Sequence, residues 1–209
     1  LPPSRGRPVE NTPAYVAQKA TATFKSLMVA AAANVRLYQI FVVDPSGPPG
    51  DATAAISEPT GVLFTSYELA DLLYIGANGF LDWEVAAHHI VHIALGWLLR
   101  ANCGPDFTAM VLMAQESSSV FLNYFLLVRH RRAGHWATNA SFLAFYLCFC
   151  LWRLVLGSYG ALSFVLRRHE LPANFPSGDA RRLDAALFLA TALQWYWGVH
   201  IGRGLWRRL

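Results

Sequence analysis

The residues of this chain that could do chemistry are histidines and carboxylates inside otherwise apolar segments. Three neighbouring segments carry them: Glu68 and Asp71 in the first, His88, His89 and His92 in the second, and Glu116 in the third. Spacings of three and four residues put each set on one face of a helix. A histidine beside a carboxylate can take up or release a proton, and both groups can hold a polar ligand. The pattern predicts a buried polar pocket in which His88, His89, Asp71 and Glu116 are the candidate catalytic residues.

Further polar side chains share these faces and could contact a ligand. Asn123 follows Glu116 at a near-helical spacing, with Ser118 in the same segment. We expect Ser118 and Asn123, together with His92 and Glu68, to bind a substrate or lipid. The run of serines at 117–119 is more typical of a small-residue packing surface between membrane helices than of an activated nucleophile.

Two arginines inside apolar segments, Arg36 and Arg153, are the candidates for balancing the carboxylates. A charged side chain at mid-membrane costs roughly 2.5 to 3.5 kcal/mol on insertion scales, so such groups are expected to pair. Two cations against Glu68, Asp71 and Glu116 leave one negative charge in excess. A protonated carboxyl group or a histidinium would remove it. The structural alternative is that these groups only fix the register of the helices.

The composition places the chain in a membrane. Of its 209 residues, 55% are hydrophobic and 14% are charged, whereas a soluble domain carries roughly 25% charged residues. A spanning helix needs about 20 apolar residues, and the chain length suits about six of them. The predicted fold is an all-α polytopic membrane helix bundle. Its spans are predicted at residues 14–43, 61–80, 83–99, 107–128, 136–166 and 185–205.

The positive charges predict an orientation. With six spans both termini share one side of the membrane, and that side carries ten Lys and Arg residues, Lys25 among them, against five on the other. The positive-inside rule then puts both termini on the cytoplasmic or matrix side, of either the endoplasmic reticulum or the mitochondrial inner membrane. Residues 1–13 are predicted to be an extramembrane tail and residues 14–209 a single transmembrane domain.

Other kinds of site fit the sequence less well. The HHxxH pattern at 88–92 could share a metal-ligand face, but membrane di-iron enzymes need several histidine boxes and this chain has one. We therefore expect no metal and no cofactor. No nucleic-acid partner is expected, because the Lys and Arg residues lie at the ends of apolar runs instead of forming a basic face. Gly198 and Gly202 form a GxxxG motif, for which packing within the bundle is favoured over self-association.

The order of these features resembles the TLC-domain membrane proteins, in the branch distant from the ceramide synthases. The resemblance covers about residues 15 to 207. Its motifs are TSYELADLLY with Asp71, AAHHIVH with His88 and His89, QESSSVFLN with Glu116, Ser118, Phe121 and Asn123, and an arginine, Arg153, in the fifth span.

The resemblance implies a multipass protein that binds or regulates membrane lipids, alone or as an accessory subunit of a larger membrane complex. In ceramide synthases the His-His pair serves acyl transfer from acyl-CoA. Their following helix carries a pair of aspartates, whereas this chain has Gln115-Glu116-Ser117. The sequence therefore favours a non-enzymatic role with membrane lipids as partners. An acyl-CoA-dependent acyltransferase and a structural subunit with a vestigial site are the alternatives.

Overall fold

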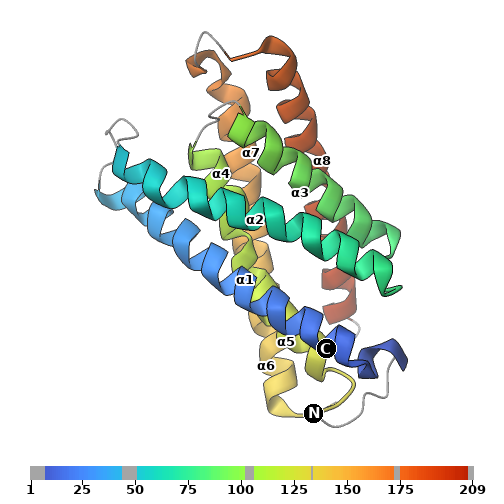
Figure 1. Cartoon of the computed structure of the whole chain (residues 1–209). Helices are drawn as coiled ribbons and strands as arrows, with labels where there is room; N and C mark the ends of the chain where they lie inside the picture. Colours follow the sequence, from blue (N-terminus) through green and yellow to red (C-terminus); the bar gives the residue numbers. More distant parts are fainter. Residues whose placement is uncertain (1–7, 44–50, 102–105, 133, 172–174, 207–209) are drawn as a thin grey trace.

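The computed structural model describes residues 8–43, 51–101, 106–132, 134–171 and 175–206. These residues form an all-α bundle of six helical rods, which confirms the predicted fold class (Figure 1). The helices are α1 (Pro13–Tyr38), α2 (Asp51–Ala77), α3 (Trp83–Ala101), α4 (Asp106–Ala114), α5 (Glu116–Val128), α6 (Trp136–Cys148), α7 (Gly157–Leu166) and α8 (Ser177–Trp206). Residues 44–50, which follow the first predicted span, and residues 1–7 of the predicted tail lie outside the described residues.

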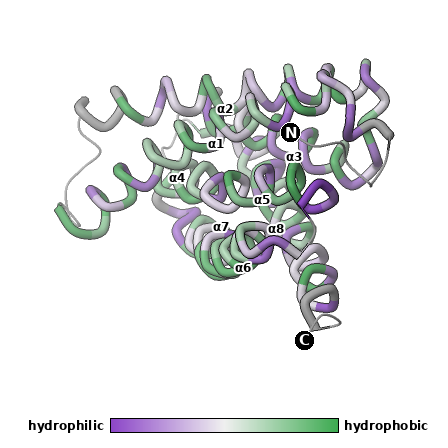
Figure 2. The backbone as a smooth tube through the Cα atoms, turned by 90° about the horizontal axis from the view of Figure 1, so that it is seen from below, coloured by the Kyte–Doolittle hydropathy of each residue, from purple (hydrophilic) through white to green (hydrophobic). Residues whose placement is uncertain are grey.

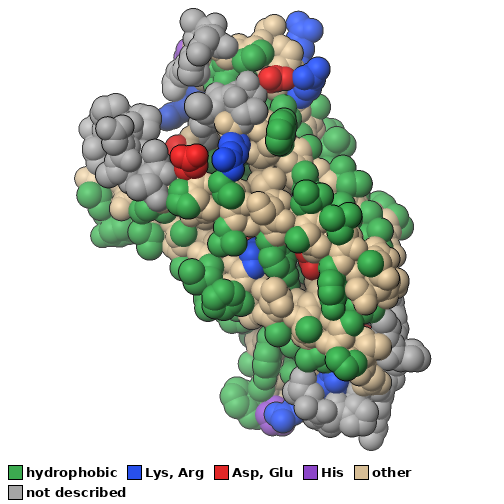
Figure 3. Space-filling view, viewed as in Figure 1, with side chains coloured by type: hydrophobic (Ala, Val, Ile, Leu, Met, Phe, Trp, Pro, Cys, Tyr) green, Lys and Arg blue, Asp and Glu red, His purple; other side chains and the backbone are tan. Residues whose placement is uncertain are grey.

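Three rods are both long enough and apolar enough to cross a membrane: Pro13–Val43, Asp106–Val128 and Trp136–Leu166. Large hydrophobic side chains such as Phe24, Leu73 and Phe188 point outward and are mostly exposed. Figure 3 shows hydrophobic side chains over the middle of the molecule, with most of the charged side chains near its two ends. This distribution is that of a membrane protein, whose outer surface faces lipid and whose ends face water.

The rods are arranged around the one formed by α4 and α5. Seen along the bundle, α1 and α2 form one layer, α3, α4 and α5 the next, and α6, α7 and α8 the last (Figure 2). Helix α5 packs against α1 on one side and α6 on the other, and α3 joins α2 to α8. Most of α4 is buried, from Met110 to Ala114. Polar groups carried by the central rod are therefore shielded from lipid.

Local sequence explains where the first helices begin and end. Thr12 accepts a hydrogen bond from the Tyr15 amide, and Pro13 follows it at the first helical position, where its missing N–H costs nothing. The short turn between α2 and α3 contains Gly79, whose φ of 70° lies in the left-handed region that glycine adopts readily. This turn brings α3 back alongside α2, so that Glu68 and Asp71 come to face the histidines.

The helices extend beyond several predicted boundaries. The second span was predicted to begin at residue 61, but residues 51–60 also belong to α2, despite Pro59. Their side chains hold them in place: Ser57 donates to Asp106 at 2.5 Å and Thr60 to the Ile56 carbonyl at 2.6 Å. In the fifth rod a π-helix, η3 (Phe149–Leu156), joins α6 to α7. Gly157 and Gly160 do not break this rod, which is continuous over the predicted fifth span, residues 136–166.

Candidate functional site

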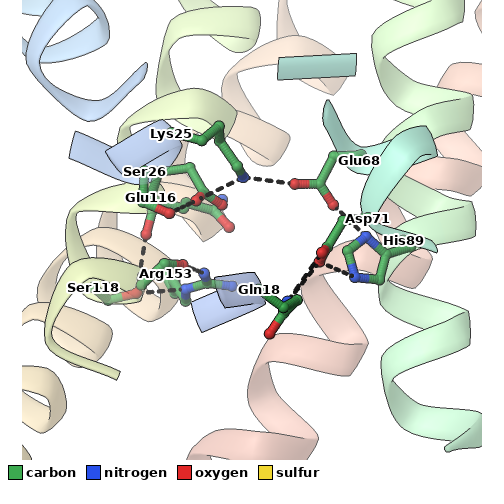
Figure 4. A network of polar contacts seen from close by, with 11 residues as sticks. Gln18, Lys25, Ser26, Glu68, Asp71, His89, Glu116, Ser118 and Arg153 are labelled. Carbon is green, nitrogen blue, oxygen red and sulfur yellow. Dashed lines mark hydrogen bonds and ion pairs between the residues drawn. The ribbon is translucent and has the colours of Figure 1, made fainter. Parts of the chain in front are cut away.

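A buried lysine lies at the centre of the polar cluster. Lys25 Nζ on α1 lies 2.7 Å from Glu68 Oε1 on α2 and 2.9 Å from Glu116 Oε2 at the start of α5. Ser26 donates to the same Glu116 oxygen at 2.5 Å. The Lys25 side chain is 6% exposed and packs over the rings of Phe64 and Tyr67. One cation therefore ties three helices together in the buried interior of the bundle (Figure 4).

On the other side of Glu68, His89 connects two carboxylates. Its Nδ1 lies 2.7 Å from Glu68 Oε2, and its Nε2 lies 3.4 Å from Asp71 Oδ2. Gln18 on α1 donates to both oxygens of Asp71, at 2.9 and 3.1 Å. The polar side chains thus continue without a gap from Gln18 through Asp71, His89 and Glu68 to Lys25.

The two nitrogens of His89 lie between the two carboxylates. Nδ1 approaches Glu68 and Nε2 approaches Asp71, although by hydrogen-bond geometry His89 Nδ1 and Glu68 Oε2 have no partner among the described residues. A neutral imidazole has one donor and one acceptor nitrogen, whereas ionised carboxylates only accept. An imidazole set between two carboxylates is the kind of arrangement that can exchange a proton with a ligand.

His88 and His92 lie beside this cluster in a different setting. The His92 ring lies against His88 with centroids 4.0 Å apart and the ring planes tilted by 48°, and its Nδ1 lies 2.8 Å from the His88 carbonyl oxygen. The His88 ring also approaches Trp197 of α8, at 5.3 Å between ring centroids. His88 Nδ1 is buried and has no hydrogen-bond partner within the described parts of the chain. Of the histidine pair, His89 is held by carboxylates and His88 keeps an unused nitrogen.

The fourth and fifth rods add a second polar centre, around Arg153. This side chain donates to Ser118 Oγ at 2.7 Å, Ser119 Oγ at 2.8 Å and Gln194 Oε1 at 3.2 Å. Figure 4 shows Arg153 on the Ser118 side of the network, with Lys25 between Glu116 and Glu68. Asn123 is also buried, one to two turns after Ser118 on α5. Ser118 and Asn123 therefore lie within the bundle, as expected for residues that could contact a ligand.

The pairing of Arg36 corrects the charge balance expected from the sequence. Arg36 Nε lies 2.7 Å from Asp106 Oδ2, and Asp106 also accepts from Ser57. These residues lie near the end of the bundle where α1 ends and α4 begins, away from the cluster. Arg36 therefore balances Asp106 and not the carboxylates of the cluster.

Lys25 was assigned by sequence reasoning to the cations outside the membrane, and this was wrong. Lys25 directly precedes the most apolar part of the first span, residues 26–43, and so was counted with the cations at the membrane edge. Helix α1 instead continues from Pro13 through Lys25, and Gln18 and Lys25 lie seven residues apart on one buried face. That spacing is the signal which identifies both residues, because positions seven apart recur on the same side of a helix.

Comparison with known proteins agrees with the motifs. The TLC domain model matches residues 26–203. No curated protein and no solved structure matches the chain. The matched region contains Glu68, Asp71, the histidines, Glu116 and Arg153, and begins within the buried face of α1. The chain is a membrane protein and belongs to the TLC-domain family.

Proposed function

We propose that this protein binds a membrane lipid inside its helix bundle, with the polar head group against the buried cluster, and so regulates membrane lipid composition. The observation that supports this most strongly is the cluster itself. Lys25, Glu68 and Glu116 are buried, with side-chain exposures of 6%, 2% and 5%, in the interior of a bundle whose outside faces lipid. Burying several charges costs more than burying apolar groups of the same size, even when the charges are paired.

The family context supports a lipid as the ligand. A TLC-domain membrane protein meets lipids laterally, and an acyl chain can lie between apolar helices while its head group enters a polar interior. The unused His88 Nδ1 offers a buried polar atom to such a head group. Membership in a larger membrane complex stays a prediction.

Lipid retention by the purified protein tests this proposal. We expect the full chain, extracted in a mild detergent, to carry lipid that mass spectrometry of an organic extract quantifies per mole of protein. Glu116→Gln should reduce this occupancy several-fold, because it removes the charge that holds Lys25 and Ser26 at the site. The matched control is Glu58→Gln, which makes the same change at an exposed position.

Two results would contradict lipid binding. One is an occupancy no higher than that of an unrelated membrane protein of similar size in the same detergent. The other is an unchanged occupancy in Glu116→Gln while Glu58→Gln is also unchanged, with both variants monodisperse. Either result would favour the structural alternative, in which the cluster only fixes helix register.

One observation favours a second candidate, acyl transfer from an acyl thioester to an amine or hydroxyl acceptor. Among the described residues His88 Nδ1 has no hydrogen-bond partner, so it can accept the proton of the attacking group, while His89 lies between Glu68 and Asp71. The acyl carbon would bond to the acceptor and the thiol would leave. Labelled acyl-CoA given to the protein with amine and lysolipid acceptors tests this. Turnover that disappears in His88→Ala and in His89→Ala would support it, and absence of turnover with every acceptor would exclude it for those substrates.

A further inference from the structure

The buried guanidinium of Arg153 is bonded only to neutral oxygens. Its three hydrogen bonds go to Ser118, Ser119 and Gln194, and Arg153 is 5% exposed. Lys25, by contrast, lies within 3 Å of two carboxylates. No ion pair joins Arg153 to a carboxylate among the residues that the structure describes. A buried guanidinium that makes no direct ion pair can still take an anionic oxygen as a further partner.

Arg153 and its neighbour Gln194 have more N–H donors than they use in hydrogen bonds. A guanidinium has five N–H bonds, of which three are used here, so two remain. The Ser118 hydroxyl donates to the Gln115 carbonyl at 2.9 Å, so it offers Arg153 only its oxygen. Gln194 is 2% exposed, its oxygen accepts from Arg153, and its Nε2 has no partner in the described residues. Unused N–H groups therefore remain on residues of both η3 and α8.

From this geometry we infer that Arg153 and Gln194 form a subsite for the phosphate group of a phospholipid. Donors from two different rods suit a tetrahedral phosphate, whose oxygens point in several directions, and Arg–phosphate hydrogen bonds are charge-assisted. Trp197 follows Gln194 by three residues and so shares its face of α8; its ring contacts His88. The subsite thus lies next to the histidines. This inference rests on the proposed lipid binding and names the part of the lipid that is recognised.

The charges of the buried side chains indicate which kind of phospholipid head group would bind. Glu68, Asp71 and Glu116 face two buried cations, Lys25 and Arg153, so the interior holds no excess positive charge before a ligand enters. A bare anion would add a further negative charge, whereas a zwitterionic head group would leave the sum unchanged. A phosphate that carries its own cationic group, as in phosphatidylcholine, is therefore expected to bind at least as well as phosphatidate.

Lipids with identical oleoyl chains test the inference. Native mass spectrometry of the full chain would compare dioleoyl phosphatidylcholine and phosphatidate with dioleoylglycerol, which lacks phosphate, and with a dioleoyl trimethylammonium lipid, which is cationic. We expect both phosphate lipids to bind about tenfold more tightly than the other two, as a charge-assisted hydrogen bond would give. Inorganic phosphate should not displace them, which would show that the phosphate is recognised as part of a lipid.

The variant Gln194→Glu separates recognition from packing. It keeps an acceptor for Arg153 but removes the amide N–H groups and places a negative charge beside the subsite. We expect the preference for phosphate to be lost without a fall in the thermal unfolding midpoint, whereas Asn139→Asp, the same change at an exposed site, should alter neither. Gln194→Leu, which removes the donors without adding charge, serves if Gln194→Glu does not fold.

Two failures can be told apart. Binding of none of the four lipids would overturn the proposed function together with this subsite. Equal binding of all four lipids, or a phosphate preference that survives both Gln194 variants, would overturn the subsite and leave lipid binding standing. Displacement of the bound phosphate lipids by inorganic phosphate would also overturn the subsite as a site for lipids.

Discussion

At the scale of single residues, the cluster depends on how five charged or titratable groups divide their contacts. Lys25 serves Glu68 and Glu116, while His89 serves Glu68 and Asp71. Glu68 is therefore shared between Lys25 and His89, and its two oxygens face them separately. Removing any one of these groups leaves another buried charge without its partner, which makes the network fragile to substitution.

Lys25→Met tests this fragility. The substitution leaves the carboxylates of Glu68 and Glu116 without their nearest cation, so we expect the free energy of unfolding to fall by about 3 kcal/mol. Denaturation in mixed detergent micelles would measure it. Arg181→Met, which removes an exposed cation, should change stability by less than about 0.5 kcal/mol.

The partner of Lys25 provides the check on this interpretation. In the double variant Lys25→Met with Glu116→Gln, one of the stranded charges is also removed, so the combined loss should be smaller than the sum of the two single losses. Additive losses would mean that Lys25 and Glu116 do not interact in the folded protein, contrary to their distance of 2.9 Å.

At the scale of elements, close helix packing positions the two polar centres. The Gly160 backbone on α7 approaches Val111 on α4 so closely that an added Cβ would lie 2.7 Å from Val111 Cγ1. A similar contact joins Gly157 to Gln115, at the point between α4 and α5. These contacts hold the fifth rod against the central rod directly after η3, which carries Arg153. The position of Arg153 therefore depends on small residues in the same rod.

Gly160→Ala should disturb this packing. We expect a loss of about 1 to 3 kcal/mol in the free energy of unfolding, as for other overpacked cores, and Val111→Ala in the same chain should recover part of it. Gly202→Ala is the control, because an added Cβ there meets nothing within 4 Å. A Gly160→Ala protein as stable as the parent would show that α4 and α7 can separate at no cost.

The two glycines of the GxxxG motif, Gly198 and Gly202, have different surroundings. A Cβ added to Gly198 would lie 3.1 Å from the Leu154 side chain of η3, whereas a Cβ added to Gly202 would have no atom within 4 Å. Packing within the bundle, the use favoured by the sequence, therefore applies to Gly198. Self-association through the motif stays untested.

At the scale of the whole molecule, ion pairs gather at the two ends of the bundle. At one end, Arg129 Nη2 lies 3.2 Å from Glu10 Oε1, and Arg131 donates to the Glu10 carbonyl oxygen. At the other, Arg168 Nη1 lies 2.6 Å from Asp184 Oδ2, and Arg36 pairs with Asp106. The first and the last described residues both lie at the end of the bundle where Arg129 pairs with Glu10 (Figure 1). Because Lys25 lies inside the bundle, the side of the termini has one cation fewer than predicted. It still carries more Lys and Arg residues than the opposite side.

Cysteine labelling in sealed vesicles tests this orientation. In a chain without its native cysteines, Asn78→Cys in the α2–α3 turn and Ser177→Cys at the start of α8 should react with a membrane-impermeant maleimide from opposite sides. Asn78→Cys should share the side of a C-terminal tag, which we propose is the cytoplasmic or matrix side. Reaction of both cysteines from one side would contradict a bundle that crosses the membrane between them.

The amino-acid sequence determined the class of this protein and the helices that carry its polar groups. Apolar runs long enough to span a bilayer, with polar residues at spacings of three and four, were sufficient to predict an all-α membrane bundle and to place Glu68, Asp71, His89 and Glu116 on interior faces. These are local properties, since each follows from a periodicity within one segment.

Only the tertiary structure decided which of these groups meet. Lys25 and Arg36 are both cations of the first helix, yet Lys25 enters the cluster and Arg36 pairs with Asp106. His88 and His89 are adjacent in sequence, yet only His89 contacts carboxylates. Such pairings depend on how helices distant in sequence rotate and cross, which is set by the packing of the whole bundle and not by any one segment.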